Sequence, residues 1–164
     1  MDTTTKKNQC DVRMGQERNL GRSMPRPTLV LDVGCGTGLS TDTCLSNCCD
    51  CGFGIGIDAS MDMLHIARGS STASKMCDFV QCDAAAPLPF RRGVFDFVVS
   101  ISALHYVMRR KRTEHLFREL RRCTRMRGPT KRCVDIDEVA MQFFPESATE
   151  AEDAAKDAKT AGWE

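Results

Sequence analysis

The segment "LVLDVGCGTG" (residues 29–38) places three glycines directly after an apolar run. Gly34, Gly36 and Gly38 have the spacing G-x-G-x-G, whereas a dinucleotide-binding turn has the spacing G-x-G-x-x-G. Because glycine has no side chain, such a turn lets the backbone approach a ligand closely at the edge of a sheet. The spacing therefore disfavours a pyrophosphate and predicts another ligand; the alternative is a tight turn without a ligand.

Carboxylates at three expected strand ends extend this candidate site. Asp32 lies in the first apolar run, Asp58 ends "FGIGID", and Asp83 follows "DFVQC". A carboxylate at the second strand end suits hydrogen bonding to ribose hydroxyls. Asp32 is expected to face a cationic amino group, and Asp83, with the Ala84 backbone, an adenine amine. A nucleoside joined to an amino acid by a cationic centre has all these groups, so the set predicts S-adenosylmethionine as cofactor. The alternative for each of these Asp residues, taken alone, is that it lies on the surface or caps a helix.

Strands and helices that alternate along the chain are expected to position these residues. The sequence predicts strands over 28–33, 53–58, 78–84 and 94–102, and helices over 39–48, 60–68, 113–124 and 147–162. Ser60 and Ser147 are expected to cap two of the helices. A fifth strand is expected within 132–145, where acidic residues leave its register open. This order predicts an α/β fold with a parallel sheet, whose strand ends meet at one edge.

Length and composition indicate one globular domain. The chain has 164 residues, of which 41% are hydrophobic and 27% are charged. No apolar run is long enough to cross a membrane, and the N-terminus lacks a secretory signal. Residues 1–27 are expected to form a flexible arm and residues 28–164 the domain.

Ten cysteines without regular spacing predict reduced thiols in the nucleus or cytosol. Cys44, Cys48, Cys49 and Cys51 form a cluster for which zinc is the alternative reading. The cluster lacks a second C-x-x-C pair at a suitable distance, so no metal site is expected.

Charge is unevenly distributed, although the net charge is +1. Residues 109–132 carry eleven Lys or Arg and two acids, whereas residues 133–164 carry nine acids and two Lys. A basic block of this kind can bind RNA, and the alternative is a solvated helix face beside a basic loop. The residues expected to contact RNA are Arg109, Arg110, Lys111 and Arg112.

Several segments together resemble the motif series of class I S-adenosylmethionine-dependent methyltransferases. These segments are "LDVGCGTG", "GID", "CDA" and "LPFRRGVFDFVVS". In addition, "SISALHY" (residues 100–106) and "QFFPES" with "AGW" are similar to the eukaryotic small-subunit ribosomal RNA guanine-N7 methyltransferase family. The resemblance implies a Rossmann-like sheet with helices on both faces, shortened here because the family's C-terminal hairpin has no counterpart before Glu164. The residues expected to bind the cofactor are Asp32, Gly34, Cys35, Gly36, Gly38, Asp58, Ala59, Asp83, Ala84 and Ser100.

The resemblance also implies a substrate, a partner and a place in the cell. These are ribosomal RNA of the pre-ribosomal small subunit, a small zinc-binding activator subunit that covers an apolar surface, and the nucleus or, alternatively, the cytoplasm. Guanine N7 has a lone pair and no proton, so the reaction needs orientation and no general base. The residues expected to position guanine are Ser100, Ser102, His105 and Tyr106. The alternative is that His105 is a loop histidine and Tyr106 a core aromatic.

Three other functions remain open from the sequence. The early motifs suit a small-molecule methyltransferase, and the whole series suits a ribosome-assembly factor that keeps the fold without catalysis. A nicotinamide-dependent oxidoreductase is the most distant alternative, because the turn has Leu39 where the third glycine of G-x-G-x-x-G would lie.

Overall fold

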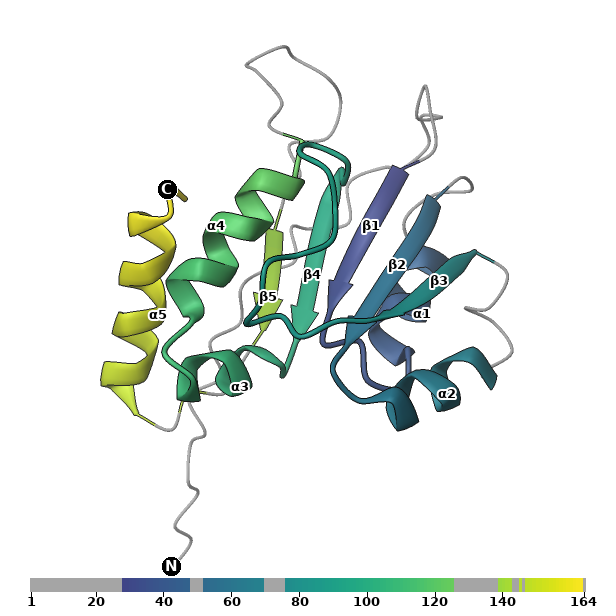
Figure 1. Cartoon of the computed structure of the whole chain (residues 1–164), viewed down its shortest axis with the longest axis horizontal. Coiled ribbons are helices and arrows are strands. Elements are labelled where there is room, and N and C mark those ends of the chain that lie inside the picture. Colours follow the sequence, from purple (N-terminus) through teal and green to yellow (C-terminus); the bar gives the residue numbers. More distant parts are fainter. Residues whose placement is uncertain are drawn as a thin grey trace, which may run out of the picture.

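A parallel sheet of five strands carries the candidate site (Figure 1). The computed structural model describes residues 28–47, 52–69, 76–125, 139–142, 145 and 147–163. Its strands are β1 (Thr28–Val33), β2 (Gly52–Asp58), β3 (Cys77–Gln81), β4 (Phe97–Ile101) and β5 (Val139–Gln142). They lie in the order β3-β2-β1-β4-β5, and every neighbouring pair is parallel. The strand order therefore reverses at β1, which has β2 on one side and β4 on the other.

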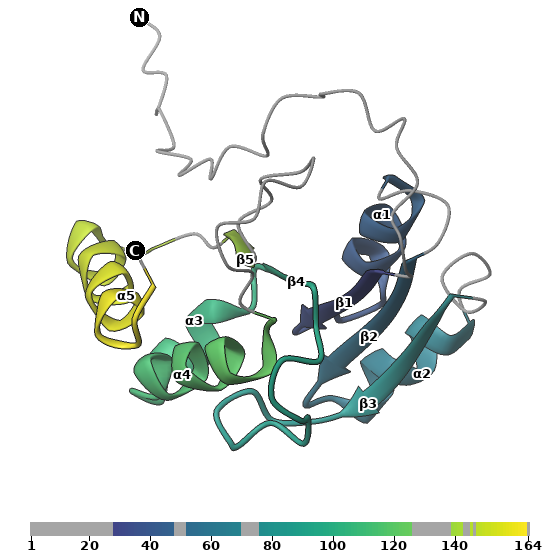
Figure 2. The same ribbon diagram turned by 90° about the horizontal axis from the view of Figure 1, so that it is seen from above.

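Helices cover both faces of this sheet, which confirms the predicted fold class (Figure 2). They are α1 (Leu39–Asn47), α2 (Met61–Gly69), α3 (Leu104–Arg109), α4 (Thr113–Cys123) and α5 (Ala148–Thr160). Helices α1 and α2 lie on one face, whereas α3 and α4 lie on the other, with α5 packed against α4. No helix in the described ranges has the length and apolar character that a membrane span requires.

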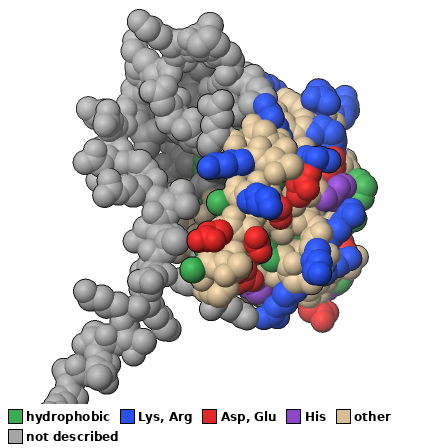
Figure 3. All heavy atoms as spheres, turned by 90° about the vertical axis from the view of Figure 1, so that its left-hand side faces the viewer, with side chains coloured by type: hydrophobic (Ala, Val, Ile, Leu, Met, Phe, Trp, Pro, Cys, Tyr) green, Lys and Arg blue, Asp and Glu red, His purple; other side chains and the backbone are tan. Residues whose placement is uncertain are grey.

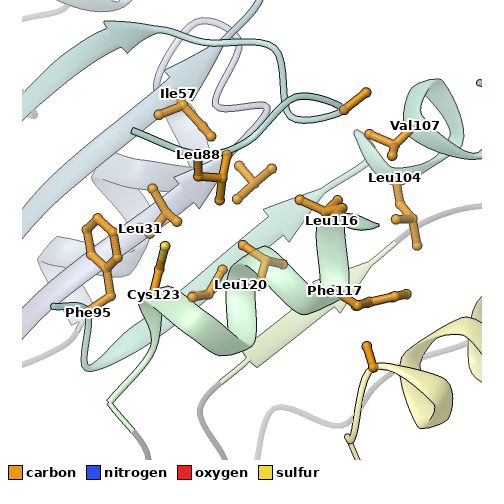
Figure 4. Packing of buried hydrophobic residues seen from close by; sticks show 14 of the residues in the cluster. Leu31, Ile57, Leu88, Phe95, Leu104, Val107, Leu116, Phe117, Leu120 and Cys123 are labelled. Atoms are coloured by element: carbon orange, nitrogen blue, oxygen red, sulfur yellow. The ribbon is translucent and has the colours of Figure 1, made fainter. Parts of the chain in front are cut away.

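The larger hydrophobic cluster fills the space between the sheet and α3, α4 and α5 (Figure 4). Leu31 and Ile57 contribute from the sheet, Leu116 and Leu120 from α4, and each is at most 1% exposed. Burying one such side chain stabilises the fold by about 1.5–3 kcal/mol. A smaller cluster on the other face joins α2 to β3; it consists of Cys35, Leu64, Ala67, Cys77 and Phe79. Packing on both faces therefore fixes the strand ends that form the site.

The fourth strand begins later than predicted because Val94 and Phe95, just before it, bind the end of α4. The Phe95 N–H donates to the Cys123 carbonyl at 3.0 Å, outside the sheet. The buried Asp96 carboxylate accepts the Leu29 N–H at 3.1 Å and pairs with Arg125 at 2.7 Å. These bonds attach the chain just before β4 both to β1 and to the end of α4.

Two predicted helix starts are confirmed, and one helix was not predicted. Ser60 Oγ accepts the Met63 N–H at 3.4 Å, and Ser147 Oγ accepts the Glu150 N–H at 3.2 Å. Helix α3 is short, and Ala103 before it makes no side-chain capping bond, so the usual start signal is absent. The predicted N-terminal arm and the first part of the predicted fifth strand lie outside the described residues.

Candidate active site

The glycine turn connects the end of β1 to the start of α1. The N–H groups of Gly34 and Cys35 donate to the Ile57 carbonyl at 2.8 and 3.0 Å, and the Gly38 N–H donates to the Cys35 carbonyl at 2.9 Å. Gly34 and Gly36 have φ values of +73° and +53°, which residues with a side chain rarely adopt. The predicted turn is therefore present, and it is fixed against the end of β2.

Two glycines of this turn have opposite surroundings. A Cβ atom at Gly34 would lie 2.2 Å from the Ala103 Cβ, so the turn after β4 lies directly against the glycine turn. A Cβ atom at Gly36 would meet no atom within 4 Å. Ligands of open parallel sheets bind outside the strand ends where the strand order reverses, which here is between β1 and β4. Gly34 therefore permits close packing, whereas Gly36 borders open space at the expected ligand position.

Asp58 ends β2 and hydrogen-bonds to the glycine turn. Its Oδ2 accepts the Gly36 N–H at 3.0 Å, and its Oδ1 accepts the Ser60 N–H at 2.8 Å. A carboxylate has about four acceptor positions. Half-buried Asp58 therefore retains acceptor positions for ligand hydroxyls beside Gly36, and the neighbouring Ala59 is exposed.

Asp32 is completely buried within β1. Its Oδ2 accepts the hydroxyls of Ser40 and Thr41 at 2.5 and 2.6 Å, whereas Oδ1 has no partner among the described residues. Burial raises the pKa of the Asp32 carboxyl. The carboxylate thus fixes the first turn of α1 and keeps one acceptor atom unused. Ser40 and Thr41 were not predicted as site residues, although two hydroxyls directly after a glycine turn were a usable signal.

Asp83 lies in the turn after β3, beyond the strand in which it was predicted. Its Oδ1 accepts the Ala85 N–H at 2.9 Å, and its Oδ2 pairs with the Arg110 guanidinium at 2.5 Å. The Arg110 hydrogen bond, and to a lesser degree the Ala85 N–H, lower the pKa of this carboxyl. A residue predicted to bind the cofactor therefore contacts a residue predicted to bind RNA. Ala84, beside it, is half-buried.

The two serines predicted to position guanine differ in exposure. Ser100 is 1% exposed, and its hydroxyl donates to the Val33 carbonyl at 2.9 Å, so it joins β4 to β1. Ser102 is exposed, its φ is +59°, and its N–H donates to the Gln142 carbonyl at 2.7 Å. Backbone strain of this kind is found mainly at functional sites. Ser102, and not Ser100, presents its side chain to solvent at this strand end.

An aromatic pair lies on α3. The His105 and Tyr106 ring centroids are 4.0 Å apart, with an angle of 39° between the ring planes. Tyr106 is 64% exposed, which excludes the alternative of a core aromatic. Exposed aromatic rings provide surfaces on which nucleobases stack.

The predicted basic block is only partly described by the structure. Arg109 ends α3, residues 110–112 connect it to α4, and all four are exposed. Farther along α4, Arg118 pairs with Glu114, and Arg122 pairs with Glu119. Figure 3 shows acidic and basic side chains interspersed on the side of the molecule where α5 lies. The charge along α4 is therefore partly compensated locally.

The thiol in the glycine turn is a packing group. Cys35 is 4% exposed, and burial raises its pKa to about 12, so the thiol stays neutral. In the predicted cysteine cluster only Cys44 lies within the described residues, where it is half-buried. Within the same ranges no group of three or more His, Cys, Asp or Glu side chains is placed to hold a metal ion.

Several curated relatives of this chain are named as RNA methyltransferases. Over 90 residues the chain is 37% identical to the 18S rRNA (guanine-N(7))-methyltransferase bud23 of Schizosaccharomyces pombe, covering 53% of this chain and 31% of that protein. It is 33% identical to RID2 of Arabidopsis thaliana, named for the same activity, covering 84% and 45%. It is also 33% identical to the tRNA (carboxymethyluridine(34)-5-O)-methyltransferase alkbh8 of Xenopus tropicalis, covering 65% and 15%. The chain thus spans less than half the length of each of these relatives.

A solved structure and a family profile agree with this comparison. The chain is similar to a chain from a Haloferax volcanii complex between the methyltransferase activator Trm112 and a methyltransferase. That match has 28% identity and a TM-score of 0.52, and it covers 62% of this chain and 43% of the other. The family described as "Methyltransferase domain" matches residues 30–128, which include the glycine turn, Asp58 and Asp83. Since this match covers more than half of the sequence, the chain belongs to the methyltransferase-domain family.

Proposed function

We propose that this chain binds S-adenosylmethionine at the edge of the sheet and directs its methyl group to guanine N7 of small-subunit ribosomal RNA. The open space beside Gly36 carries the proposal, because it lies where the strand order reverses and any side chain there would fill it. The family match and the relatives named as guanine-N7 methyltransferases support this reaction.

The groups around that space fit the parts of this cofactor. Asp58 offers acceptors to ribose hydroxyls, and Asp83 with the Ala84 backbone offers acceptors to the adenine amine. The backbone of residues 34–38 is available to the amino-acid end, whereas the fully buried Asp32 acts indirectly, by fixing Ser40 and Thr41 directly after the glycine turn. When bound, the cofactor supplies an electrophilic methyl group on a positively charged sulfur.

The protein's task toward guanine is to orient it. Guanine N7 already has a lone pair, so no side chain has to remove a proton. The rate enhancement then comes from correct positioning of the base and the methyl group. The exposed Tyr106 ring, held beside His105, is suited to stack on the base, and Ser102 is suited to hydrogen-bond its edge. Ser100 acts indirectly, by fixing the end of β4 to Val33. Residues 109–112 are proposed to contact the flanking phosphates.

A calorimetric titration with S-adenosylmethionine tests the cofactor site. Gly36→Val is expected to abolish binding, because the new side chain occupies the open space. Gly69→Val is the control for the added side chain, since a Cβ there also meets no atom within 4 Å but lies at the far end of α2. Because Gly36 has a positive φ and Gly69 does not, the stability of Gly36→Val is measured by urea denaturation alongside the titration. Unchanged affinity in a folded Gly36→Val variant would refute the proposed site.

A methylation assay tests the substrate. Labelled cofactor is expected to produce N7-methylguanine in small-subunit ribosomal RNA and little product when Tyr106 is replaced by Ala. Transfer RNA is the second substrate to assay, because one relative is named as a tRNA methyltransferase. Product in transfer RNA alone would favour that second function. Cofactor binding without transfer to either RNA would favour the assembly-factor function.

A second polypeptide belongs to the same proposal. Among the described strands β3 pairs with β2 alone, and α2 beside it exposes Met61, Met63 and Ile66 by 39%, 42% and 56%. An apolar surface beside an unpaired strand is typical of a protein contact. We propose that a small zinc-binding activator covers it, and the similarity to a chain of the Haloferax volcanii complex supports an activator as partner. Ile66→Asp is then expected to abolish co-purification, whereas unchanged co-purification would exclude this surface.

The proposed substrate also suggests where the protein acts. Small-subunit assembly begins in the nucleus, so a fluorescent fusion of the chain is expected there. A purely cytoplasmic signal would contradict this part of the proposal.

A further inference from the structure

Arg110 joins two parts of the site that the proposed function treats separately. Its guanidinium contacts Asp83 Oδ2 at 2.5 Å, and the two side chains are 58% and 42% exposed. Arg110 directly follows α3, the helix that carries Tyr106, whereas Asp83 follows β3. The ion pair therefore connects the segment proposed to bind RNA with the carboxylate proposed to bind adenine.

Both carboxylate oxygens of Asp83 already accept a hydrogen bond, Oδ1 from the Ala85 N–H and Oδ2 from Arg110. Arg112 Nε also donates to the Ala85 carbonyl at 3.1 Å, so a second arginine lies at the same turn. An adenine amino group that binds Oδ2 would share this oxygen with Arg110. A guanidinium beside that oxygen also compensates the carboxylate's negative charge, which makes the carboxylate a weaker partner for another donor.

We propose that Arg110 couples RNA binding to cofactor binding by moving from Asp83 to an RNA phosphate. Guanidinium binds phosphate through two hydrogen bonds, so a phosphate near residues 109–112 is a strong competitor for Arg110. Once Arg110 leaves, Asp83 Oδ2 is open to the adenine amine. RNA and cofactor then bind with positive cooperativity, and linkage makes the effect equal in both directions. This inference rests on the proposed function.

The exposure of the ion pair limits the size of the coupling. Exposed pairs of this kind are weak because water competes for both charges. RNA is therefore expected to tighten cofactor binding by at most about fivefold, which corresponds to about 1 kcal/mol.

The test measures the dissociation constant of S-adenosylhomocysteine with and without saturating single-stranded oligouridine. Oligouridine supplies phosphates without guanine, and S-adenosylhomocysteine lacks the sulfonium charge. In the unchanged protein, oligouridine is expected to tighten binding about two- to fivefold. In Arg110→Gln this tightening is expected to disappear, because the ion pair is already broken. Arg118→Gln removes the same charge from the exposed face of α4 and is expected to keep the tightening.

Asp83→Asn is a second variant that breaks the same ion pair, from the carboxylate side. It is also expected to lose the tightening by oligouridine. The coupling would be overturned by unchanged affinity in the presence of bound oligouridine, by failure of oligouridine to bind, or by full tightening in Arg110→Gln. If S-adenosylhomocysteine does not bind the unchanged protein at all, the proposed function itself is wrong. Binding without coupling leaves the proposed function intact.

Discussion

Alanine at Gly34 and at Gly36 is expected to have contrasting effects on stability and binding. The two substitutions are chemically identical and lie two residues apart, and both require a side chain at positive φ. Their surroundings differ, because the Cβ at Gly34 would lie 2.2 Å from the Ala103 Cβ, whereas the Cβ at Gly36 meets nothing within 4 Å. The pair therefore separates a packing role from a ligand-binding role within one turn.

The expected magnitudes follow from these contacts. A side chain in the left-handed region costs about 1–2 kcal/mol. At Gly34 the turn after β4 must also move away, and overpacking of this kind costs a further 1–3 kcal/mol or so. Gly34→Ala is therefore expected to lower the free energy of unfolding by about 2–5 kcal/mol, and Gly36→Ala by about 1–2 kcal/mol.

Urea denaturation and calorimetry together check this prediction. Urea denaturation of the ligand-free protein gives the two free energies of unfolding, and calorimetry gives the affinity for S-adenosylmethionine. Gly36→Ala is expected to remain folded and to lose affinity, because its new methyl group enters the space proposed for the cofactor. Equal losses of stability, or a larger loss for Gly36→Ala, would refute the assignment of Gly34 to packing.

Three further predictions concern buried groups. In the ligand-free protein Asp32→Asn is expected to weaken the pH dependence of stability, because a raised folded-state pKa of Asp32 means that stability is lost as the pH rises above 3.8. Urea denaturation of both proteins should show a smaller loss of stability with rising pH in the variant; an equal loss would contradict the sign. Asp96→Asn weakens the ion pair of a 3% exposed carboxylate with Arg125 and should lower the free energy of unfolding by about 1–3 kcal/mol. An unchanged melting temperature would contradict this. Cys35, with a pKa of about 12, should react with iodoacetamide much more slowly than half-buried Cys44, as measured by mass spectrometry of each peptide. Equal labelling of both thiols would show that Cys35 is accessible.

Local sequence patterns were enough to predict the strands of the sheet and the residues at their carboxyl ends. The run from Thr28 to Val33 predicts β1 with its observed bounds, because apolar residues lie between Pro27 and Gly34. The spacing of the glycines predicts the turn, and Asp58 ends a strand of alternating small and apolar residues. Each of these signals depends on neighbours within a few positions.

The partners of the predicted site residues could not be predicted in the same way. Asp83 meets Arg110 only because the β3 and α3 ends converge, although the two residues are 27 positions apart in the sequence. Asp32 looks like an open acceptor in the sequence, but packing of α1 buries it beneath Ser40 and Thr41. Sequence patterns locate such carboxylates at an edge, whereas tertiary contacts decide which of their oxygens are used.

The strand order also has a consequence for the path by which the protein folds. Strands β1, β2 and β3 pair in chain order with their helices between them, whereas β4 must return to β1 across a long stretch of chain. The Leu29–Asp96 and Ser100–Val33 bonds each span 67 residues, and closing such long loops is slow. The glycine turn is therefore expected to form with the early strands, and Ala103 is expected to contact it only when β4 pairs with β1. Folding intermediates with three paired strands are expected to contain the turn before Ser102 and the aromatic pair on α3 lie beside it.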